Sequence, residues 1–185
     1  MSRIHENMQY QTKLIFADTL DELLKNNHFS NITVSDIITA SRVSRATFYR
    51  HFKDKYDLVQ WMYKNKLEEL LACNKGDDSW RKITEEIYVY LLEKKFFFSK
   101  VIPFDTQNSL LEYIYELTIH DLGQRIMEKT NQSVLSKDDS LALKLYSAGI
   151  IHIIRGWVES GMKEDPKDMA RRVCDSMPNC LVKYF

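Results

Sequence analysis

The stretch ITVSDIITASRVSRATFYRHFKDK, residues 32–55, decides the fold of this chain. Its apolar positions predict a short helix over about residues 34–40, a turn at 41–43 and a second short helix over about 45–51. Two short helices joined by so tight a turn are typical of a helix-turn-helix. In that arrangement the second helix is held out from the body, where its outward side chains can enter a DNA major groove about 12 Å wide.

The starts of these helices carry side chains that suit helix capping. Thr33 stands three residues before Asp36, which approximates a capping box with aspartate in place of the usual glutamate or glutamine. Ser44 is a good N-cap for the second short helix. Asp54 is predicted to cap the next helix, which runs to about Cys73.

The second short helix carries many hydrogen-bond donors and cations for its length. Ala46 and Phe48 are expected to face inward. Arg45 or Arg50 could pair bidentately with a guanine, whereas the polar side chains around them would suit phosphates. The candidate DNA-binding residues are Thr33, Ser35, Ser44, Arg45, Ala46, Thr47, Tyr49, Arg50, His51 and Lys55. The alternative interpretation is a solvated basic helix above buried aromatic residues.

The charge of the chain is unevenly distributed, although its formal net charge is zero. The segment from Arg42 to Lys66 holds seven cations and two anions, whereas residues 74–185 hold 16 cations and 17 anions. A basic region beside a neutral remainder is expected when one face of a protein meets a polyanion.

The rest of the chain also reads as helical. Helices are predicted over about residues 10–27, 54–73, 80–94, 109–129, 141–162 and 169–184, with a short segment at 96–98 and a break at 74–78. With only five glycines and three prolines, a turn-rich β fold is disfavoured. We predict an all-α fold with a helix-turn-helix DNA-binding domain at 1–53, a linking helix at about 54–73 and a regulatory and dimerisation domain at 74–185.

Several classes of site and location are not expected. The three cysteines, Cys73, Cys174 and Cys180, form no CxxC pair, so we expect reduced thiols in a cytoplasmic protein, without a zinc site. The polar beginning of the chain does not read as a signal peptide. No uninterrupted apolar stretch approaches the ~18–20 residues of a membrane span. No metal and no cofactor is predicted.

The second half offers aromatic residues that could line an effector pocket. The candidates are Phe97, Phe98, Phe104, Tyr113, Tyr115, His120, Tyr146 and Trp157. The alternative is that these side chains are core, because aromatic residues at helical spacing pack more often than they line a cavity. The effector itself, a small molecule or a protein, is not identified by the sequence.

A helix predicted over about residues 141–158 is apolar nearly all round, so we expect it to be buried on several faces. Gly149 and Gly156 would allow a second helix to approach closely. A further apolar stripe runs from Met169 to Val182. A four-helix interface between two protomers would bury both elements, and a monomer that buries them internally is the alternative.

Residues 10–60 resemble the TetR family of transcriptional regulators. The resemblance is carried, without a gap, by Thr33-Val34-Ser35-Asp36-Ile37, Ala40, Val43-Ser44-Arg45, Thr47-Phe48-Tyr49, His51-Phe52, Asp54-Lys55 and Leu58. It implies a three-helix DNA-binding head, with a recognition helix at Ser44 to His51, and a larger domain that dimerises through its last two helices. Family members often carry glycine between the two short helices, where this chain has Ser41-Arg42.

The C-terminal part resembles the subgroup of regulatory domains that includes the activator of a dihydroxyacetone kinase operon. The residues that carry this resemblance are Phe97, Lys100-Val101, Gln107-Asn108-Ser109, Ala148-Gly149-Ile150-Ile151, Trp157, Gly161-Met162 and Pro166. Activators of that kind take their signal from a protein partner, so the subgroup implies that the effector of such a domain need not be a free metabolite.

The sequence therefore predicts a sequence-specific DNA-binding transcriptional regulator. It is expected to act as a homodimer on a double-stranded DNA operator, away from membranes, and to be gated by a small-molecule or protein effector. The alternatives are a helical small-molecule-binding protein and a protein-interaction adaptor without specific DNA binding. An enzyme is disfavoured, because the chain has no GxGxxG, P-loop, HExxH or GxSxG motif.

Overall fold

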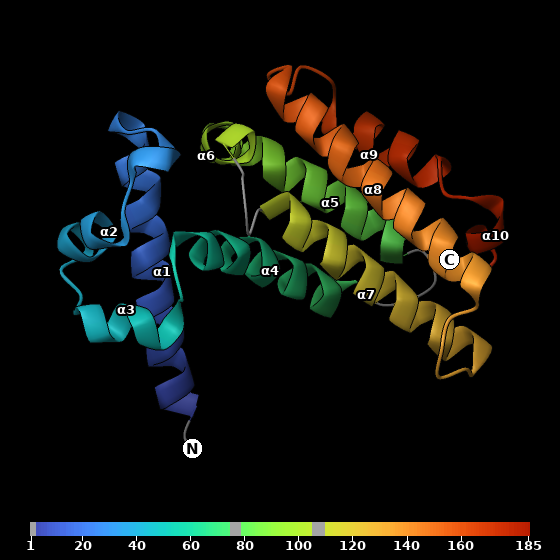
Figure 1. Cartoon of the computed structure of the whole chain (residues 1–185), viewed down its shortest axis with the longest axis horizontal. Coiled ribbons are helices and arrows are strands. Elements are labelled where there is room, and N and C mark those ends of the chain that lie inside the picture. Colours follow the sequence, from blue (N-terminus) through green and yellow to red (C-terminus); the bar gives the residue numbers. More distant parts are fainter. Residues whose placement is uncertain (1–2, 75–78, 105–109) are drawn as a thin grey trace. The chain divides into compact units, whose positions relative to one another are not determined.

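The computed structural model describes residues 3–74, 79–104 and 110–185, and its regular secondary structure in these ranges is entirely helical (Figure 1). The predicted all-α fold is confirmed. Contacts divide the chain into two compact units, residues 1–65 and residues 66–185. The division falls within α4 (Lys55–Cys73), the helix that the sequence assigns to a link between domains.

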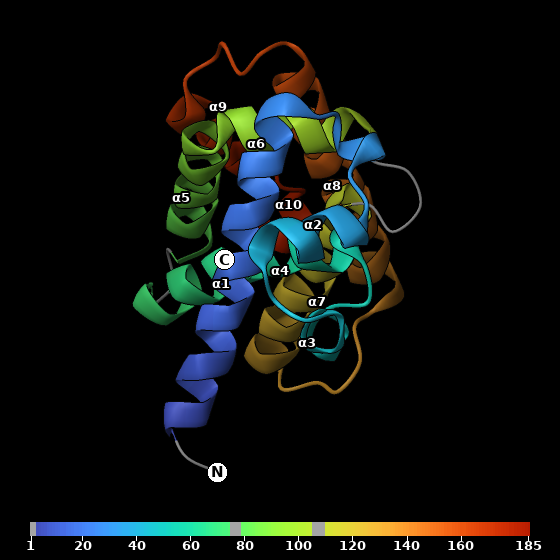
Figure 2. The ribbon, with the colours of Figure 1, turned by 90° about the vertical axis from the view of Figure 1, so that its left-hand side faces the viewer.

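The first unit consists of three helices, one short 3-10 helix and the beginning of α4. These elements are α1 (Arg3–Asn26), η1 (Phe29–Asn31), α2 (Val34–Ser41) and α3 (Arg45–His51). α2 packs against α1 and contacts α3, as Figures 1 and 2 show from two sides. The predicted bounds of the two short helices are confirmed to within about one residue.

An aromatic cluster holds α3 in place from its inner side. Phe48 is fully buried, and its ring centre lies 5.0 Å from that of Phe16 on α1 and 5.7 Å from that of Phe52. The ring centre of Phe52 in turn lies 5.9 Å from that of Trp61 on α4. Because such ring pairs bury large apolar areas, one side of α3 is fixed while the other remains available. Ala46 is exposed, so the expectation that it faces inward is wrong.

The second unit is a bundle of helices. Its elements are α5 (Ser79–Glu93), α6 (Lys95–Val101), η2 (Ile102–Phe104), α7 (Leu110–Thr130), α8 (Lys137–Glu159), α9 (Pro166–Asp175) and α10 (Asn179–Val182), after the end of α4. α5 runs along α9, α7 runs along α8, and α6 and α10 also contact α8 (Figure 1). α8 therefore contacts three other helices of this unit.

Several predicted boundaries changed in the second unit, and the helix expected over 141–162 is Lys137–Glu159. The helix expected over 169–184 is two helices, because Pro178 lies between them, has no amide hydrogen to donate and stands at the N-cap of α10. The short segment at 96–98 belongs to α6, a regular helix. α9 begins at Pro166, three residues before the predicted 169, because the Asp165 side chain accepts from the backbone amides of Lys167 and Asp168 at 3.0 Å and so caps the helix. Most of the predicted break, residues 75–78, lies outside the described residues.

Within the single chain α8 is buried on one side only, which contradicts the alternative that a monomer buries this helix internally. Burial of its other side by a second copy stays a prediction. Ile150, Ile154 and Trp157 face the core, whereas Leu145 remains 66% exposed and Ile153 43% exposed. By length and composition α8 could also cross a membrane, with 39% of its apolar window buried. The sequence expectation overlooked it because it considered uninterrupted apolar runs and not average hydropathy. Core helices of soluble proteins pass the same test.

Candidate nucleic-acid interface

The start of α2 is fixed by a complete capping box. The backbone amide of Thr33 donates to Asp36 Oδ2 at 2.8 Å, and the backbone amide of Asp36 donates to Thr33 Oγ1 at 3.2 Å. The Thr33 hydroxyl also donates to the same carboxylate, at 2.7 Å. These donors hold the pKa of the Asp36 carboxyl below its ordinary value. The box therefore defines the direction in which the chain enters the helix-turn-helix.

The turn between α2 and α3 contains a residue in the left-handed conformation. Arg42 has φ of 57° and ψ of 21° and forms the C-cap of α2. The amide of Val43 donates to Ser41 Oγ at 3.3 Å, and that hydroxyl donates to the carbonyl of Ile38 at 3.1 Å. A side chain thus occupies the place where the family often has glycine, at some conformational cost.

Ser44 begins α3 as predicted, because its Oγ accepts from the backbone amide of Thr47 at 3.1 Å. Beyond this cap the side chains of Arg45, Ala46, Tyr49 and Arg50 are exposed, and Tyr49 is 47% exposed. With Phe48 buried on the opposite side, α3 presents cations and an aromatic ring on one surface. This surface has the chemistry that reads base edges and contacts phosphates.

The exposed side chains of α3 contact one another. The guanidinium of Arg45 lies 5.3 Å from the centre of the Tyr49 ring, and one of its nitrogens lies 3.5 Å from the tyrosine hydroxyl. Arg50 donates to Thr47 Oγ1 at 3.4 Å, and Thr47 Oγ1 lies 2.8 Å from Ser44 Oγ. All these residues belong to α3 or to its N-cap, so the contacts require no other element.

The remaining candidates lie beside this surface. Thr33 and Ser35 are exposed at the start of α2. His51 is half-buried, and burial together with the positive charges of Lys13 and Arg50 lowers the pKa of its imidazole. A neutral imidazole has one N–H that can donate a hydrogen bond to a phosphate.

The prediction that Lys55 contacts phosphate is wrong for this structure. Its side chain is 9% exposed, and its ammonium donates to the backbone carbonyls of Phe29, Ser30 and Ile32. All three protons of an ammonium are used in this way. Lys55 therefore has an internal role that its position beside the recognition helix did not indicate.

The predicted effector candidates are dispersed over several environments. Phe97, Phe98 and Trp157 are at most 2% exposed and pack as core, as the alternative interpretation expected. His120 is exposed. Tyr113 and Tyr115 are half-buried, and Tyr146 donates to the carbonyl of Val173 at 2.9 Å. The side chain of Phe104 lies outside the described residues.

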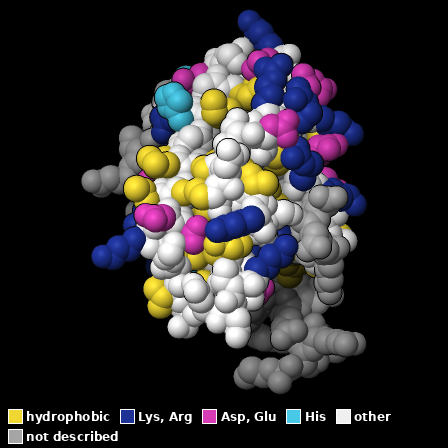
Figure 3. Space-filling view, turned by 90° about the vertical axis from the view of Figure 1, so that its right-hand side faces the viewer, with side chains coloured by type: hydrophobic (Ala, Val, Ile, Leu, Met, Phe, Trp, Pro, Cys, Tyr) yellow, Lys and Arg dark blue, Asp and Glu magenta, His cyan; other side chains and the backbone are white. Residues whose placement is uncertain are grey.

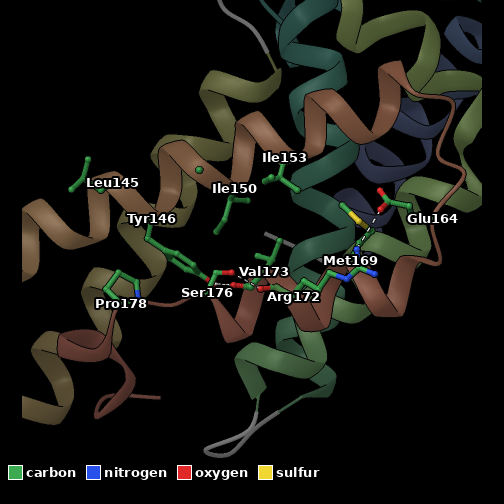
Figure 4. A pocket seen from close by; sticks show the side chains of 11 residues that line it. Leu145, Tyr146, Ile150, Ile153, Glu164, Met169, Arg172, Val173, Ser176 and Pro178 are labelled. Atoms are coloured by element: carbon green, nitrogen blue, oxygen red, sulfur yellow. Dashed lines mark hydrogen bonds and ion pairs between the residues drawn. The ribbon is translucent and has the colours of Figure 1, made fainter.

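An open groove of about 590 Å³ lies between α8 and α9 (Figure 4). Of the candidates whose side chains the structure describes, Tyr146 alone lines it. Its other lining residues are Leu145, Gly149, Ile150, Ile153, Glu164, Met169, Arg172, Val173, Ser176 and Pro178. Arg172 is engaged at one end, at 3.4 Å from both Glu164 and Asp168. Among the described residues, no group of three or more histidines, cysteines and carboxylates could hold a metal ion.

Two family models match this chain. Residues 18–62 match the model of bacterial regulatory proteins of the tetR family, and residues 78–179 match a model of the C-terminal region of transcriptional regulators. Together with the helix-turn-helix of the first unit, these matches define a DNA-binding transcriptional regulator. The chain belongs to the TetR family.

Relatives and solved structures agree with this assignment. The HTH-type dhaKLM operon transcriptional activator DhaS of Lactococcus lactis subsp. lactis (strain IL1403) is 30% identical over 107 residues, which are 57% of each chain. The HTH-type transcriptional regulator YxbF of Bacillus subtilis (strain 168) is 38% identical over 52 residues, which are 28% of this chain and 14% of YxbF. The matched segments thus span less than two thirds of either relative.

The fold is that of solved regulators over nearly the whole chain. A structure of the dihydroxyacetone kinase operon activator DhaS aligns with a TM-score of 0.64 at 21% identity, over 94% of this chain and 97% of that chain. A TetR transcriptional regulator from Streptococcus agalactiae 2603V aligns with a TM-score of 0.63 at 20% identity, over 95% and 98%. At this identity the likeness concerns the fold.

Proposed function

We propose that α3 reads operator DNA through Arg45, Tyr49 and Arg50, and that residues around it set its position on the backbone. Thr33, Ser35, Ser44, Thr47 and His51 would contact phosphates, and Ala46 would face the bases. This proposal is supported by the different burial of the two sides of α3. Phe48 is fully buried, whereas Arg45, Tyr49 and Arg50 are all exposed. A helix of this width and chemistry fits the major groove.

We propose further that two copies of the chain form a homodimer through α8 and α9. The outer side of α8 exposes Leu141, Leu145 and Ile153, at 59%, 66% and 43%. In Figure 3, hydrophobic side chains gather in the middle of the face that is drawn, with lysines and arginines beside them. A copy packed on the outer side of α8 would fill the groove of Figure 4 and cover its exposed side chains.

No neighbouring atom lies within 4 Å of the place where a Cβ would stand on Gly149 or Gly156 of α8. A helix from a second copy could therefore approach α8 closely at these two positions. In a symmetric dimer the two recognition helices would meet half-sites about one helical turn of DNA apart, roughly 34 Å. Dimerisation would thus determine the spacing of the operator half-sites.

We propose that an effector, either a small molecule or a protein, acts on residues 66–185 and changes operator affinity. This proposal is supported by membership of a family whose regulators typically respond to effectors, and by the likeness to the activator DhaS. The chain would act in the cytoplasm, where Cys73 and Cys180, which are exposed and free in this structure, stay reduced. A thermal-shift screen of metabolites on the purified chain tests for a small-molecule effector.

The DNA proposal is tested by titrating the full chain against its own upstream DNA and against random DNA over a salt series. Specific binding should show a log–log slope of about −0.9 per phosphate contacted. The double variant Tyr49→Ala with Arg50→Ala should lose operator binding and keep its oligomeric state. Lys163→Ala, which removes an exposed cation from the second unit, should bind as the parent does. Parental binding by the double variant would refute the assignment of α3.

A further inference from the structure

The ammonium group of Lys55 lies in a cage of backbone carbonyls and aromatic rings. It donates to the carbonyls of Phe29 at 2.6 Å, Ile32 at 2.7 Å and Ser30 at 3.2 Å. It also lies 4.6 Å from the ring centre of Phe29 and 5.5 Å from that of Tyr56. These two rings pack edge to face, with centres 5.4 Å apart. The cage therefore satisfies the donors and the charge of the ammonium at once.

The cage joins the two ends of the helix-turn-helix. Phe29, Ser30 and Ile32 belong to η1 and its C-cap, immediately before α2 begins. Lys55 is the first residue of α4, shortly after α3 ends at His51. The three hydrogen bonds span 23 to 26 residues, a segment that contains the whole of α2 and α3. A single side chain thus connects the segment before α2 to the segment after α3.

The positive charge of Lys55 is unfavourable in the first turn of α4 unless nearby negative groups compensate it. A cation in the first turn of a helix opposes the positive end of the helix dipole of α4. The carbonyls at the end of η1 form the negative end of another helical turn, and the charges of Asp36 and Asp54 also favour the ammonium. Burial lowers the pKa of this group. The carbonyls and these carboxylates compensate for the burial, and the side chain is directed inward.

We propose that Lys55 is a positioning residue that ties the entry of α2 to the start of α4 and so holds α3 in the orientation required for operator binding, without contacting DNA. Both ends of the segment that carries α3 are then fixed by one set of hydrogen bonds. The expected effect on operator affinity rests on the proposed DNA interface. The expected effect on amide hydrogen exchange does not, because it can be measured on the free protein.

The first test is amide hydrogen exchange of the free chain. Lys55→Met keeps most of the aliphatic stem and removes the three donors, so the amides of residues 31–37 should exchange about tenfold or more faster than in the parent. Lys53→Met makes the same change at an exposed lysine two residues away and should leave these amides unchanged. Unchanged exchange in Lys55→Met would overturn the clamp whether or not the chain binds the proposed operator.

The second test is operator binding over a salt series. Lys55→Met should lower specific affinity about tenfold or more, with the salt slope of the parent retained, because no phosphate contact is lost. Affinity equal to that of the parent would overturn the positioning role. A slope reduced by about 0.9 would instead make Lys55 a phosphate ligand. If Lys55→Met does not fold, by circular dichroism, Lys55→Gln replaces it, and the same outcomes decide.

Discussion

The guanidinium carbon of Arg45 lies 5.3 Å from the centre of the Tyr49 ring, one helical turn further along the exposed surface of α3. A cation over an aromatic face at an exposed site contributes about 0.5–1 kcal/mol. The contact restricts the arginine before DNA arrives, so less conformational entropy is lost when it pairs with a base. Tyr49 therefore supports Arg45 in addition to its proposed contact with DNA.

Replacement of Tyr49 separates these two roles. Tyr49→Ala removes the ring and the hydroxyl and should weaken specific operator binding about tenfold or more, because Arg45 loses its support. Tyr49→Phe keeps the ring and should remain within about threefold of the parent. Fluorescence anisotropy with labelled operator DNA measures both. If Tyr49→Phe lost as much affinity as Tyr49→Ala, the hydroxyl and not the ring would be the functional group.

Arg42 provides a test of the turn. Its left-handed backbone, with φ of 57°, costs a residue with a Cβ about 1–2 kcal/mol, whereas glycine adopts it freely. Since glycine loses more chain entropy on folding, Arg42→Gly should stabilise the helix-turn-helix by a net amount of about 0.5–1 kcal/mol. Native-state hydrogen exchange of the α2 and α3 amides measures this change.

Arg42→Ala is the matched control, because it removes the charge and keeps the Cβ. It should give no gain in exchange protection. Stabilisation by alanine equal to that by glycine would show that charge repulsion among the cations of this region, and not backbone strain, limits the stability of the turn.

The capping box predicts a pH dependence that belongs to Asp36. Hydrogen bonds from Thr33 lower the pKa of this carboxyl in the folded state below its ordinary value of 3.8. Its contribution to stability is therefore fully present above pH 3.8 and is lost as the pH falls through the lower, folded-state pKa. Asp36→Asn cannot titrate, so the stability advantage of the parent over this variant should shrink below pH 3.8.

Thermal melting followed by circular dichroism from pH 6 down to about pH 2 measures this advantage. The control is Asp138→Asn, which removes another carboxylate from the first turn of a helix, in the second unit and outside the capping box. An advantage of Asp36 that stayed constant over the whole range would mean that the carboxylate does not hold the cap.

Local signals predicted the helix-turn-helix well, because capping depends on side chains within three residues of the helix start. Thr33, Ser44 and Asp54 each accept the backbone hydrogen bonds that their positions implied. The apolar spacing likewise placed α2 and α3 to within about one residue. These features require no knowledge of which distant elements meet.

The features that could not be predicted from the sequence depend on tertiary contacts. Lys55 was read as a phosphate ligand, because its partners lie 23 to 26 residues earlier in the chain. One signal was present: a lysine at the first position of a helix is poorly placed unless it has a partner elsewhere. Similarly, nothing in the pattern of Phe97 and Phe98 distinguishes a packed core from a pocket wall, and the structure buries both.

The exposed side of α8 provides the last prediction, which concerns assembly. Leu145 is 66% exposed and lines the groove between α8 and α9, so its replacement by glutamate should not disturb the core of the protomer. In a dimer that packs on this side of α8, however, the charge would be buried without a partner at a cost of several kcal/mol. Leu145→Glu should therefore shift the chain from dimer to monomer in sedimentation velocity, with its helical content retained.

Val134→Glu is the matched control, because Val134 is 72% exposed and lies in the loop before α8, away from the groove. It adds the same charge at an equally exposed apolar residue and should leave the dimer intact. Since a monomer would engage only one half-site, Leu145→Glu should also weaken operator binding although α3 is unchanged. A parental sedimentation coefficient for Leu145→Glu would place the dimer contact elsewhere, and a purely monomeric parent would show that the apolar side of α8 is not an interface between copies of this chain.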